Sequence, residues 1–221
     1  ESLNKYSPDN IFNMDEAALF FRAIPNKSYL MPDEGDPRLA GRGCKTMASK
    51  ERLTLILCAN ATGHRKIVPV VIGSAKKPRC FQQKQPCIPY FNQRNAWNDK
   101  KNFVKWWDEV FLPDIRVWTK DPVALLLDGF SGHDRNVKDP NGQVTVFVFP
   151  PNVTSVYQPM DQGIIAAFKG GYKSRLLSHL VQTAGDNELQ ALAKQLPSGT
   201  AGLSYGCPPN VGDAIILVKE S

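Results

Sequence analysis

The stretch VALLLDGFSGH, residues 123–133, is an apolar run that ends on an aspartate. Asp128-Gly129 is a strong turn signal, but a hairpin needs a second alternating strand, and the residues that follow do not supply one. A short unbroken apolar run is typical of a strand that is covered on both faces. The stretch therefore predicts a buried strand whose last residue, Asp128, lies at the carboxyl end, where open α/β sheets bind ligands.

The segments around this run predict a mixed α/β fold with a partly antiparallel sheet. Apolar or alternating runs predict further strands at 10–21, 52–63, 66–75 and 143–152. The strands at 52–63 and 66–75 are expected to form a hairpin. FVKWWDEVFLPDI (103–115) has apolar residues at spacings of three and four, which predicts an amphipathic helix with Trp106 and Trp107 in the core. Further helices are expected from Pro159 and after Asn210, which is placed as an N-cap.

Positive charge is concentrated in one part of a chain whose formal net charge is +6. No acidic residue lies between Glu51 and Asp99, while that interval holds Arg52, Arg65, Lys66, Lys76, Lys77, Arg79, Lys84 and Arg94. A second basic group follows at Lys169, Lys173 and Arg175. Clustered Lys and Arg suit a polyanion such as the phosphate backbone of DNA, although a solvated protein face produces the same pattern. The charges alone leave both explanations open.

Composition excludes several other classes of protein. No apolar run approaches the ~18 residues of a membrane span, and the first residues lack the layout of a signal peptide. We therefore expect a soluble, intracellular protein with no membrane partner. The five cysteines are scattered and form no CxxC pair, which indicates neither a zinc site nor a disulfide framework.

Three aspartates stand at the ends of predicted elements. Asp15 ends or interrupts the strand at 10–21, Asp128 closes its strand, and Asp161 opens a helix after QPM. Each also has a structural explanation: a polar strand end, a turn residue, and a negative charge favoured by the helix macrodipole. The individual positions do not decide between structure and catalysis.

The surrounding sequence resembles a known catalytic domain. NIFNMDEAALF, ERLTLILCANATGHRKIVPVVIGSAKKPRCF, ALLLDGFSGH and FVFPPNVTSVYQPMDQGIIAAFK resemble the pogo/Tigger branch of mariner-type transposases, a domain shared by centromere-protein-B-like and Jerky-like host proteins. The resemblance covers roughly residues 6–182 and implies an RNase H-like α/β fold, for which we expect a mixed five-stranded sheet flanked by helices. It maps the three carboxylates of a DDE-type site onto Asp15, Asp128 and Asp161.

The resemblance also points to residues around the carboxylates. Gly129 stands where relatives commonly have Asn, and His133 matches a His that relatives also show, with a capping, phosphate-neighbouring or catalytic role left open. Glu16 is either a supporting residue behind the site or, as we expect, a solvent-facing one.

Phosphodiester cleavage gives these residue types a chemical reason. Two divalent ions about 3.5–4 Å apart activate a water and stabilise the leaving oxygen. Mg²⁺ or Mn²⁺ prefers carboxylate ligands, so we expect two such ions, with Asp15 bridging both and Asp128 and Asp161 each holding one. The residues expected to grip DNA are Arg52, Arg65, Lys66, Lys76, Lys77, Arg79, Lys169, Lys173 and Arg175.

The resulting hypothesis is a nuclear transposase domain that cleaves DNA and transfers strands. A homo-oligomer is compatible with this hypothesis. We expect a catalytic domain at 1–182, a linker or loop at 183–209, and at 210–221 the truncated start of a helix of the same domain. The alternative is a domesticated or decayed protein that binds DNA or protein without cleaving. A nuclease of another RNase H-like family is disfavoured, because no acidic residue follows Asp161 until Asp186.

Overall fold

A single mixed sheet forms the centre of the molecule in the computed structural model, which describes residues 2–23, 51–150, 157–183 and 209–221. Its six strands are arranged in the order β4-β3-β2-β1-β5-β6. β2 runs antiparallel to β1 and β3, while the pairs β1–β5, β5–β6 and β3–β4 are parallel. The strands are β1 (Ile11–Leu19), β2 (Leu53–Asn60), β3 (Val70–Gly73), β4 (Tyr90–Asn92), β5 (Val123–Leu127) and β6 (Val144–Val148).

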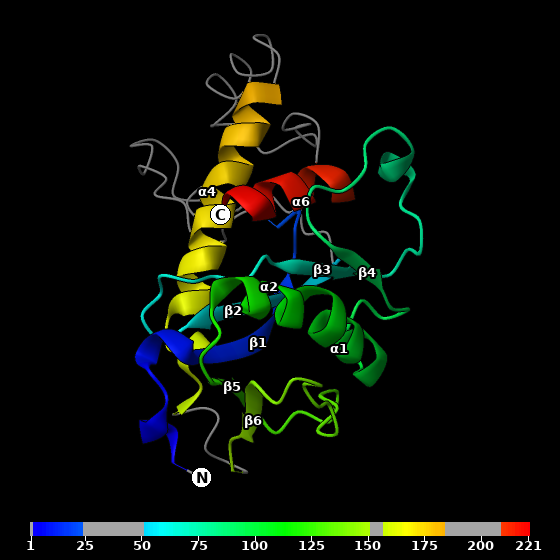
Figure 1. The fold of residues 1–221 in the computed structure, drawn as a ribbon. Coiled ribbons are helices and arrows are strands. Elements are labelled where there is room, and N and C mark those ends of the chain that lie inside the picture. The colour runs from blue at the N-terminus through cyan, green and yellow to red at the C-terminus, as the bar shows by residue number, and fades with distance from the viewer. Residues whose placement is uncertain (1, 24–50, 151–156, 184–208) are drawn as a thin grey trace, which may run out of the picture.

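Helices cover both faces of this sheet (Figure 1). On one face, α1 (Lys100–Trp106) continues through a π-helical turn, η5 (Trp107–Phe111), into α2 (Leu112–Trp118). On the other face lie η6 (Pro159–Asp161), α4 (Ile164–Thr183) and α6 (Val211–Glu220). The short 3₁₀ turns η1 (Leu3–Lys5), η2 (Pro8–Asn10) and η4 (Arg79–Gln82) complete the described elements.

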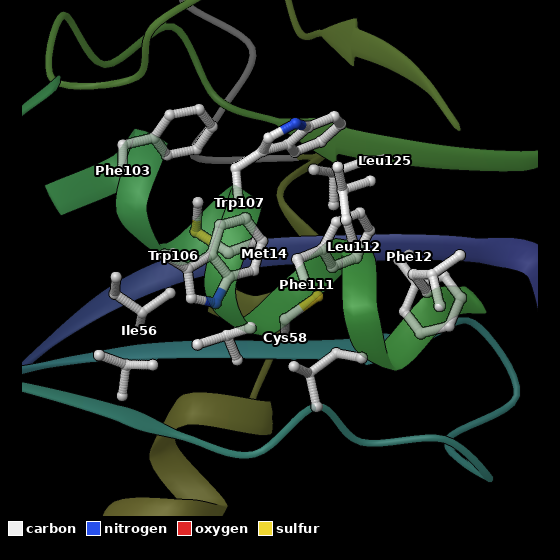
Figure 2. Packing of buried hydrophobic residues seen from close by; sticks show 14 of the residues in the cluster. Phe12, Met14, Ile56, Cys58, Phe103, Trp106, Trp107, Phe111, Leu112 and Leu125 are labelled. Carbon is white, nitrogen blue, oxygen red and sulfur yellow. The ribbon is translucent and has the colours of Figure 1, made fainter. Parts of the chain in front are cut away.

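The core beneath α1 and α2 is dominated by aromatic side chains (Figure 2). Trp106 and Trp107 are 0% and 1% exposed, and each stacks on Phe111, with ring centroids 5.0 and 5.4 Å apart. The expectation that both tryptophans belong to the core is confirmed. They pack on strand residues such as Phe12 and Met14, so this helix fixes one face of β1.

Most expected elements are present, with two differences. The strand at 10–21, the hairpin of β2 and β3, the buried strand at 123–127 and the Asn210 cap, which forms a capping box with Asp213, are confirmed. The expected five-stranded sheet has six strands, because β4 lies in a segment without any apolar periodicity and is too short to show one. Asp161 does not open α4 but ends the separate turn η6.

The aromatic core supplies a stability prediction. Phe111→Ala removes a ring that contacts both tryptophans, and we expect the free energy of unfolding to fall by about 3–5 kcal/mol. Val117→Ala, on α2 at a side chain 85% exposed, is the control and should change it by less than about 0.5 kcal/mol. Urea unfolding of both variants checks this, and equal losses would contradict the packing described.

Candidate active site

The strand directions bring several chain segments to one edge of the sheet. β1, β3, β4, β5 and β6 all run the same way, because β2 is antiparallel to both of its neighbours. Their carboxyl ends therefore share an edge, which we call the carboxyl edge, and ligands of open α/β sheets bind at such edges. The register pairs Ile11 with Ala124 and Asn13 with Leu126, and its continuation places Asp15 level with Asp128.

The buried side chain of Asn13 joins three parts of this edge. Its Nδ2 donates to the backbone oxygen of Leu126 and to Oε1 of Gln158, both at 3.0 Å, and its Oδ1 accepts from the backbone nitrogen of Met160 at 3.0 Å. Gln158 Nε2 donates to the backbone oxygen of Met14 at 3.3 Å. Asn13 and Gln158 are 6% and 0% exposed, so these amides have no water to replace the partners.

The residues of this network are close in sequence to all three predicted catalytic aspartates. Asp15 lies two residues beyond Asn13, Asp128 lies two residues beyond Leu126, and Asp161 directly follows Met160. Neither Asn13 nor Gln158 was singled out from the sequence. The signal was present in the polar Asn13 between the apolar residues Phe12 and Met14, since a buried amide requires partners.

Asp15 lies in an environment that opposes its negative charge. Burial, together with the nearby charges of Asp161 and Glu16, raises the pKa of Asp15 to about 7, against the opposing hydrogen bonds from the Glu16 backbone and Gln158. The Glu16 nitrogen donates to Oδ1 of Asp15 at 2.7 Å. The structure thus brings Asp15 within electrostatic range of Asp161, and a cation is the natural counter-charge for such a pair.

Asp128 is held by the loop that follows it. Its Oδ1 accepts from the Phe130 nitrogen at 3.0 Å and lies 3.1 Å from Nδ1 of His133, off the direction of a well-aligned hydrogen bond. Burial raises the pKa of Asp128, but His133, the Phe130 amide and Arg135 outweigh it and the net pKa is lowered. Asp128 is therefore poised as a carboxylate.

His133 links Asp128 to Glu16 across the sheet edge. Its Nε2 lies 3.0 and 3.2 Å from the two carboxylate oxygens of Glu16, and Nδ2 of Asn98 also donates to Oε1 of Glu16. Burial lowers the pKa of His133, but hydrogen bonds and charges of Asp128 and Glu16 raise it to about 9 overall. His133 thus lies buried between two carboxylates, a position that favours its charged form.

The solvent-facing expectation for Glu16 is wrong. Its side chain is 6% exposed, because strand alternation turns Met14 and Glu16 toward α1 while Asn13 and Asp15 face η6. The pairing with His133 compensates the buried charge of Glu16. Glu16 therefore supports Asp128 from behind, through His133.

The predicted DNA-gripping residues do not all lie on one surface. Arg52 precedes β2, and Lys76 and Lys77 follow β3, so these three lie at the carboxyl edge and are exposed or half-buried. Arg65 and Lys66 lie in the β2–β3 turn at the opposite edge. Arg65 is also paired with Asp114, with Nε 2.9 Å from Oδ2. The structure therefore does not bring Arg65 and Lys66 to the edge that carries the aspartates, and their contact with DNA stays a prediction.

The remaining basic residues lie on the face of the sheet that carries α4. Arg79 is exposed in η4, while Lys169, Lys173 and Arg175 lie along α4, the helix that starts just after Asp161. Lys173 is exposed, and Lys169 and Arg175 are half-buried. At 1.5 Å per residue, Lys169 is about 7.5 Å along the axis of α4 from its first residue, Ile164.

The chemistry of the three aspartates fits a hard divalent cation, but their side chains do not form a complete set of metal ligands. Aspartate oxygens are the ligands that Mg²⁺ and Mn²⁺ prefer, and Asp15 and Asp161 repel each other without a counter-charge. Within the described ranges, however, no three His, Cys, Asp or Glu side chains are close enough to hold a metal ion together. None of the helices in those ranges is long and apolar enough to cross a membrane.

Comparisons with known proteins show the family to which the sequence belongs. A family model described as DDE superfamily endonuclease matches residues 50–207. The Jerky protein of Mus musculus is 35% identical over 170 residues, 73% of this chain and 29% of that protein. The CENP-B homolog protein 2 of Schizosaccharomyces pombe is 32% identical over 196 residues, 82% of this chain and 35% of that protein.

A human relative, Tigger transposable element-derived protein 7, is 28% identical over 180 residues, 76% of this chain and 32% of that protein. The chain thus spans about a third of the length of the curated relatives it matches. No solved structure matches it.

The raised pKa of Asp15 predicts how stability depends on pH. Because ionising Asp15 is unfavourable in the folded state, the free energy of unfolding falls as pH rises from its ordinary pKa of 3.8 through about 7. In EDTA at about pH 8, the free energy of unfolding of Asp15→Asn should exceed that of the wild type by roughly 2–4 kcal/mol. This difference should vanish toward about pH 4, where Asp15 of the wild type is protonated.

Urea unfolding across this pH range measures the difference. Asp121→Asn is the matched control, because Asp121 is exposed just before β5 at the opposite edge. An Asp15→Asn protein that is no more stable than the wild type at high pH would contradict the environment described for Asp15.

Proposed function

The chain belongs to the DDE superfamily endonuclease family, and on that basis we propose that residues 1–182 form a metal-dependent domain that cleaves DNA and transfers strands. The observation that supports this most directly is the Asn13 network, which joins β1, β5 and the η6 segment next to Asp15, Asp128 and Asp161. Members of this superfamily share the RNase H-like fold, to which the six-stranded mixed sheet with flanking helices corresponds.

The proposed reaction has two steps at phosphorus. Water attacks a phosphodiester, the bond to the 3′-oxygen breaks, and a proton returns to that oxygen to give a 3′-hydroxyl. The 3′-hydroxyl then attacks a target phosphodiester, forming one phosphorus–oxygen bond as another breaks. Two Mg²⁺ or Mn²⁺ ions, when bound, would supply the charge that activates the nucleophile and stabilises the leaving oxygen.

The protein residues divide the remaining work. The carboxylates of Asp15, Asp128 and Asp161 would hold the ions. His133 and Glu16 keep Asp128 ionised and oriented, and the pKa of Asp128, lowered despite burial, supports that role. The Lys and Arg side chains would position the DNA by contacting its phosphates. Such contacts carry no sequence information.

The DNA-gripping surface in this proposal is smaller than the sequence suggested. Arg52, Lys76 and Lys77 at the carboxyl edge and Lys169 and Lys173 on α4 would contact phosphates on either side of the carboxylates. Binding by this part of the protein should be weak, sequence-independent and strongly dependent on salt.

The wider biological setting follows from the substrate. Chromosomal DNA places the proposed site of action in the nucleus, and joining two DNA ends favours a homo-oligomer. We propose that 183–209, most of which lies outside the described residues, links this domain to α6, which packs against α4 and η4.

A second candidate function is DNA binding without cleavage. It is favoured by the absence of a closed three-ligand cluster within the described ranges and by the pairing of Asp128 with His133. Gly129 does not add to this case, since a side chain there would meet only Arg135, 4.0 Å away, and relatives' Asn would fit.

Plasmid nicking distinguishes the two functions. With Mg²⁺ or Mn²⁺ the wild type should nick supercoiled DNA, and Asp128→Ala should lower the rate at least about 100-fold, because it removes a ligand worth several kcal/mol of charge stabilisation. Asp121→Ala, an exposed aspartate at the other end of β5, should nick like the wild type.

Two results would count against cleavage. Equal nicking by wild type and Asp128→Ala would remove Asp128 from the site. A folded wild type that binds plasmid but never nicks it with either metal would support binding alone.

A further inference from the structure

An exposed tryptophan lies close to the carboxylates and takes no part in the core. Trp97 is 36% exposed, in contrast to Trp106 and Trp107, which are fully buried. It follows β4 in the loop 93–98, so it stands at the carboxyl edge. An exposed indole is costly to leave in water and is a common partner for nucleobases and other flat rings.

The loop holds Trp97 in a fixed, strained position. Ala96 has φ of 49°, the left-handed region, and is the only non-glycine residue with positive φ in the described part of the chain. Its carbonyl accepts from Oγ1 of Thr54 at 2.6 Å, and its nitrogen donates to the Gln93 oxygen at 2.7 Å. Strain retained in this way is typical of positions that orient a functional side chain.

The buried end of the same loop is anchored to the site. Asn98, 2% exposed, donates to Glu16, which is bound to His133. The position of Trp97 is therefore coupled to the same residues that orient Asp128.

Trp97 carries a cation and a second ring beside it. The guanidinium carbon of Arg52 lies 4.7 Å from the indole centroid, and its Nη2 donates to the Asn95 oxygen at 3.1 Å. The Phe130 ring meets Trp97 edge to face, with centroids 6.1 Å apart. Phe130 is itself confined, because a Cβ at Gly132 would lie 2.1 Å from its ring.

Arg52 also lines a basic hollow next to this cluster. A pocket of about 300 Å³ is lined by Phe20, Arg52, Ser74, Arg94, Asn95 and Ala96, with two guanidinium groups, no acidic side chain and a Phe20 ring that is 50% exposed. Phe20 lies five residues beyond Asp15, about 16 Å along an extended strand. A nucleotide a few positions from a phosphate at the carboxylates reaches that far.

We propose that Trp97, Arg52 and Phe130 form a stacking site for an unpaired nucleotide of the DNA strand held at the carboxyl edge. The base stacks on the aromatic surface, and Arg52 and Arg94 receive its flanking phosphates. This inference deepens the proposed function, because it supplies the site with a preference for DNA that is frayed or single-stranded next to the cut. Base-paired DNA has no free base face to offer this site.

The chain contains a matched control for this site. Trp118 is 37% exposed and also lies under a guanidinium, that of Arg65 at 5.5 Å. It ends α2 just before β5, at the edge opposite the carboxylates. The two tryptophans are exposed to nearly the same extent and each lies under a guanidinium, but only Trp97 lies at the carboxyl edge and beside Phe130.

The test compares two probes by fluorescence anisotropy in EDTA: a blunt duplex, and the same duplex with a short 3′ single-stranded overhang. Wild type should prefer the overhang, and Trp97→Ala should weaken overhang binding by about 5- to 150-fold while blunt binding changes by less than about twofold. Trp97→Phe should retain most of the preference, and Trp118→Ala should keep all of it.

Other outcomes would overturn the inference. These are an unchanged overhang affinity in Trp97→Ala, an equal loss for both probes, or the same loss in Trp118→Ala. Urea unfolding of each variant confirms that the compared proteins are folded, and Trp97→Phe provides the comparison if the alanine variant is not. The assay needs neither metal nor cleavage, so a wild type that nicks but lacks the Trp97-dependent preference sinks only this inference. A wild type that shows the Trp97-dependent preference for the overhang but never nicks DNA would contradict only the proposed function.

Discussion

The arrangement of the whole edge depends on one buried amide, that of Asn13. A buried polar group left without a partner costs about 1–3 kcal/mol, so the three partners of Asn13 are tied to a single geometry. Those partners belong to β1's neighbour β5 and to the η6 segment, and each is followed within three residues by an aspartate. Segments distant in sequence are thereby held in register without any contact between the carboxylates themselves.

Bringing several carboxylates to one edge of the sheet lowers the stability of the fold. The protein compensates the charge of Asp128 but not that of Asp15. Asp128 has a buried cationic partner in His133, which Glu16 holds from the other side. Asp15 has only backbone and amide donors and lies near Asp161, so its pKa rises to about 7 with burial as the main cause. A divalent cation would therefore stabilise the protein most beside Asp15 and Asp161, whose charges have no such partner. A loss of stability of this kind is typical of functional sites.

The sequence predicts those parts of the structure that have a local pattern. Strands β1, β2, β3, β5 and β6, the helix with Trp106 and Trp107, the Asn210 cap and the position of Asp128 just after a buried strand could all be expected. The expected positions of the other two aspartates are wrong, because Asp15 lies within the uninterrupted β1 and Asp161 ends η6. β4 could not, because three residues show no periodicity. The separation of Arg65 and Lys66 from the other basic residues depends on strand direction, which charge counting cannot supply.

Other features depend on contacts between remote segments. The burial of Glu16 follows from its pairing with His133, more than 100 positions away, and hence from the tertiary fold. Asn13 and Gln158 likewise acquire their role only when β1, β5 and η6 meet. Trp97 carried no sequence signal, since nothing local distinguishes an indole under an arginine at the sheet edge from one in the core.

The central claim is that the Asn13 amide aligns the three carboxylates to share divalent ions. A calorimetric titration of Mn²⁺ into the wild type and into Asn13→Ala tests it most directly, because that variant keeps every carboxylate. The account predicts Mn²⁺ binding by the wild type and an affinity about 10- to 100-fold lower in folded Asn13→Ala, the usual effect of losing a residue that orients metal ligands. Unchanged Mn²⁺ affinity in that variant, or a wild type that binds no Mn²⁺, would contradict it.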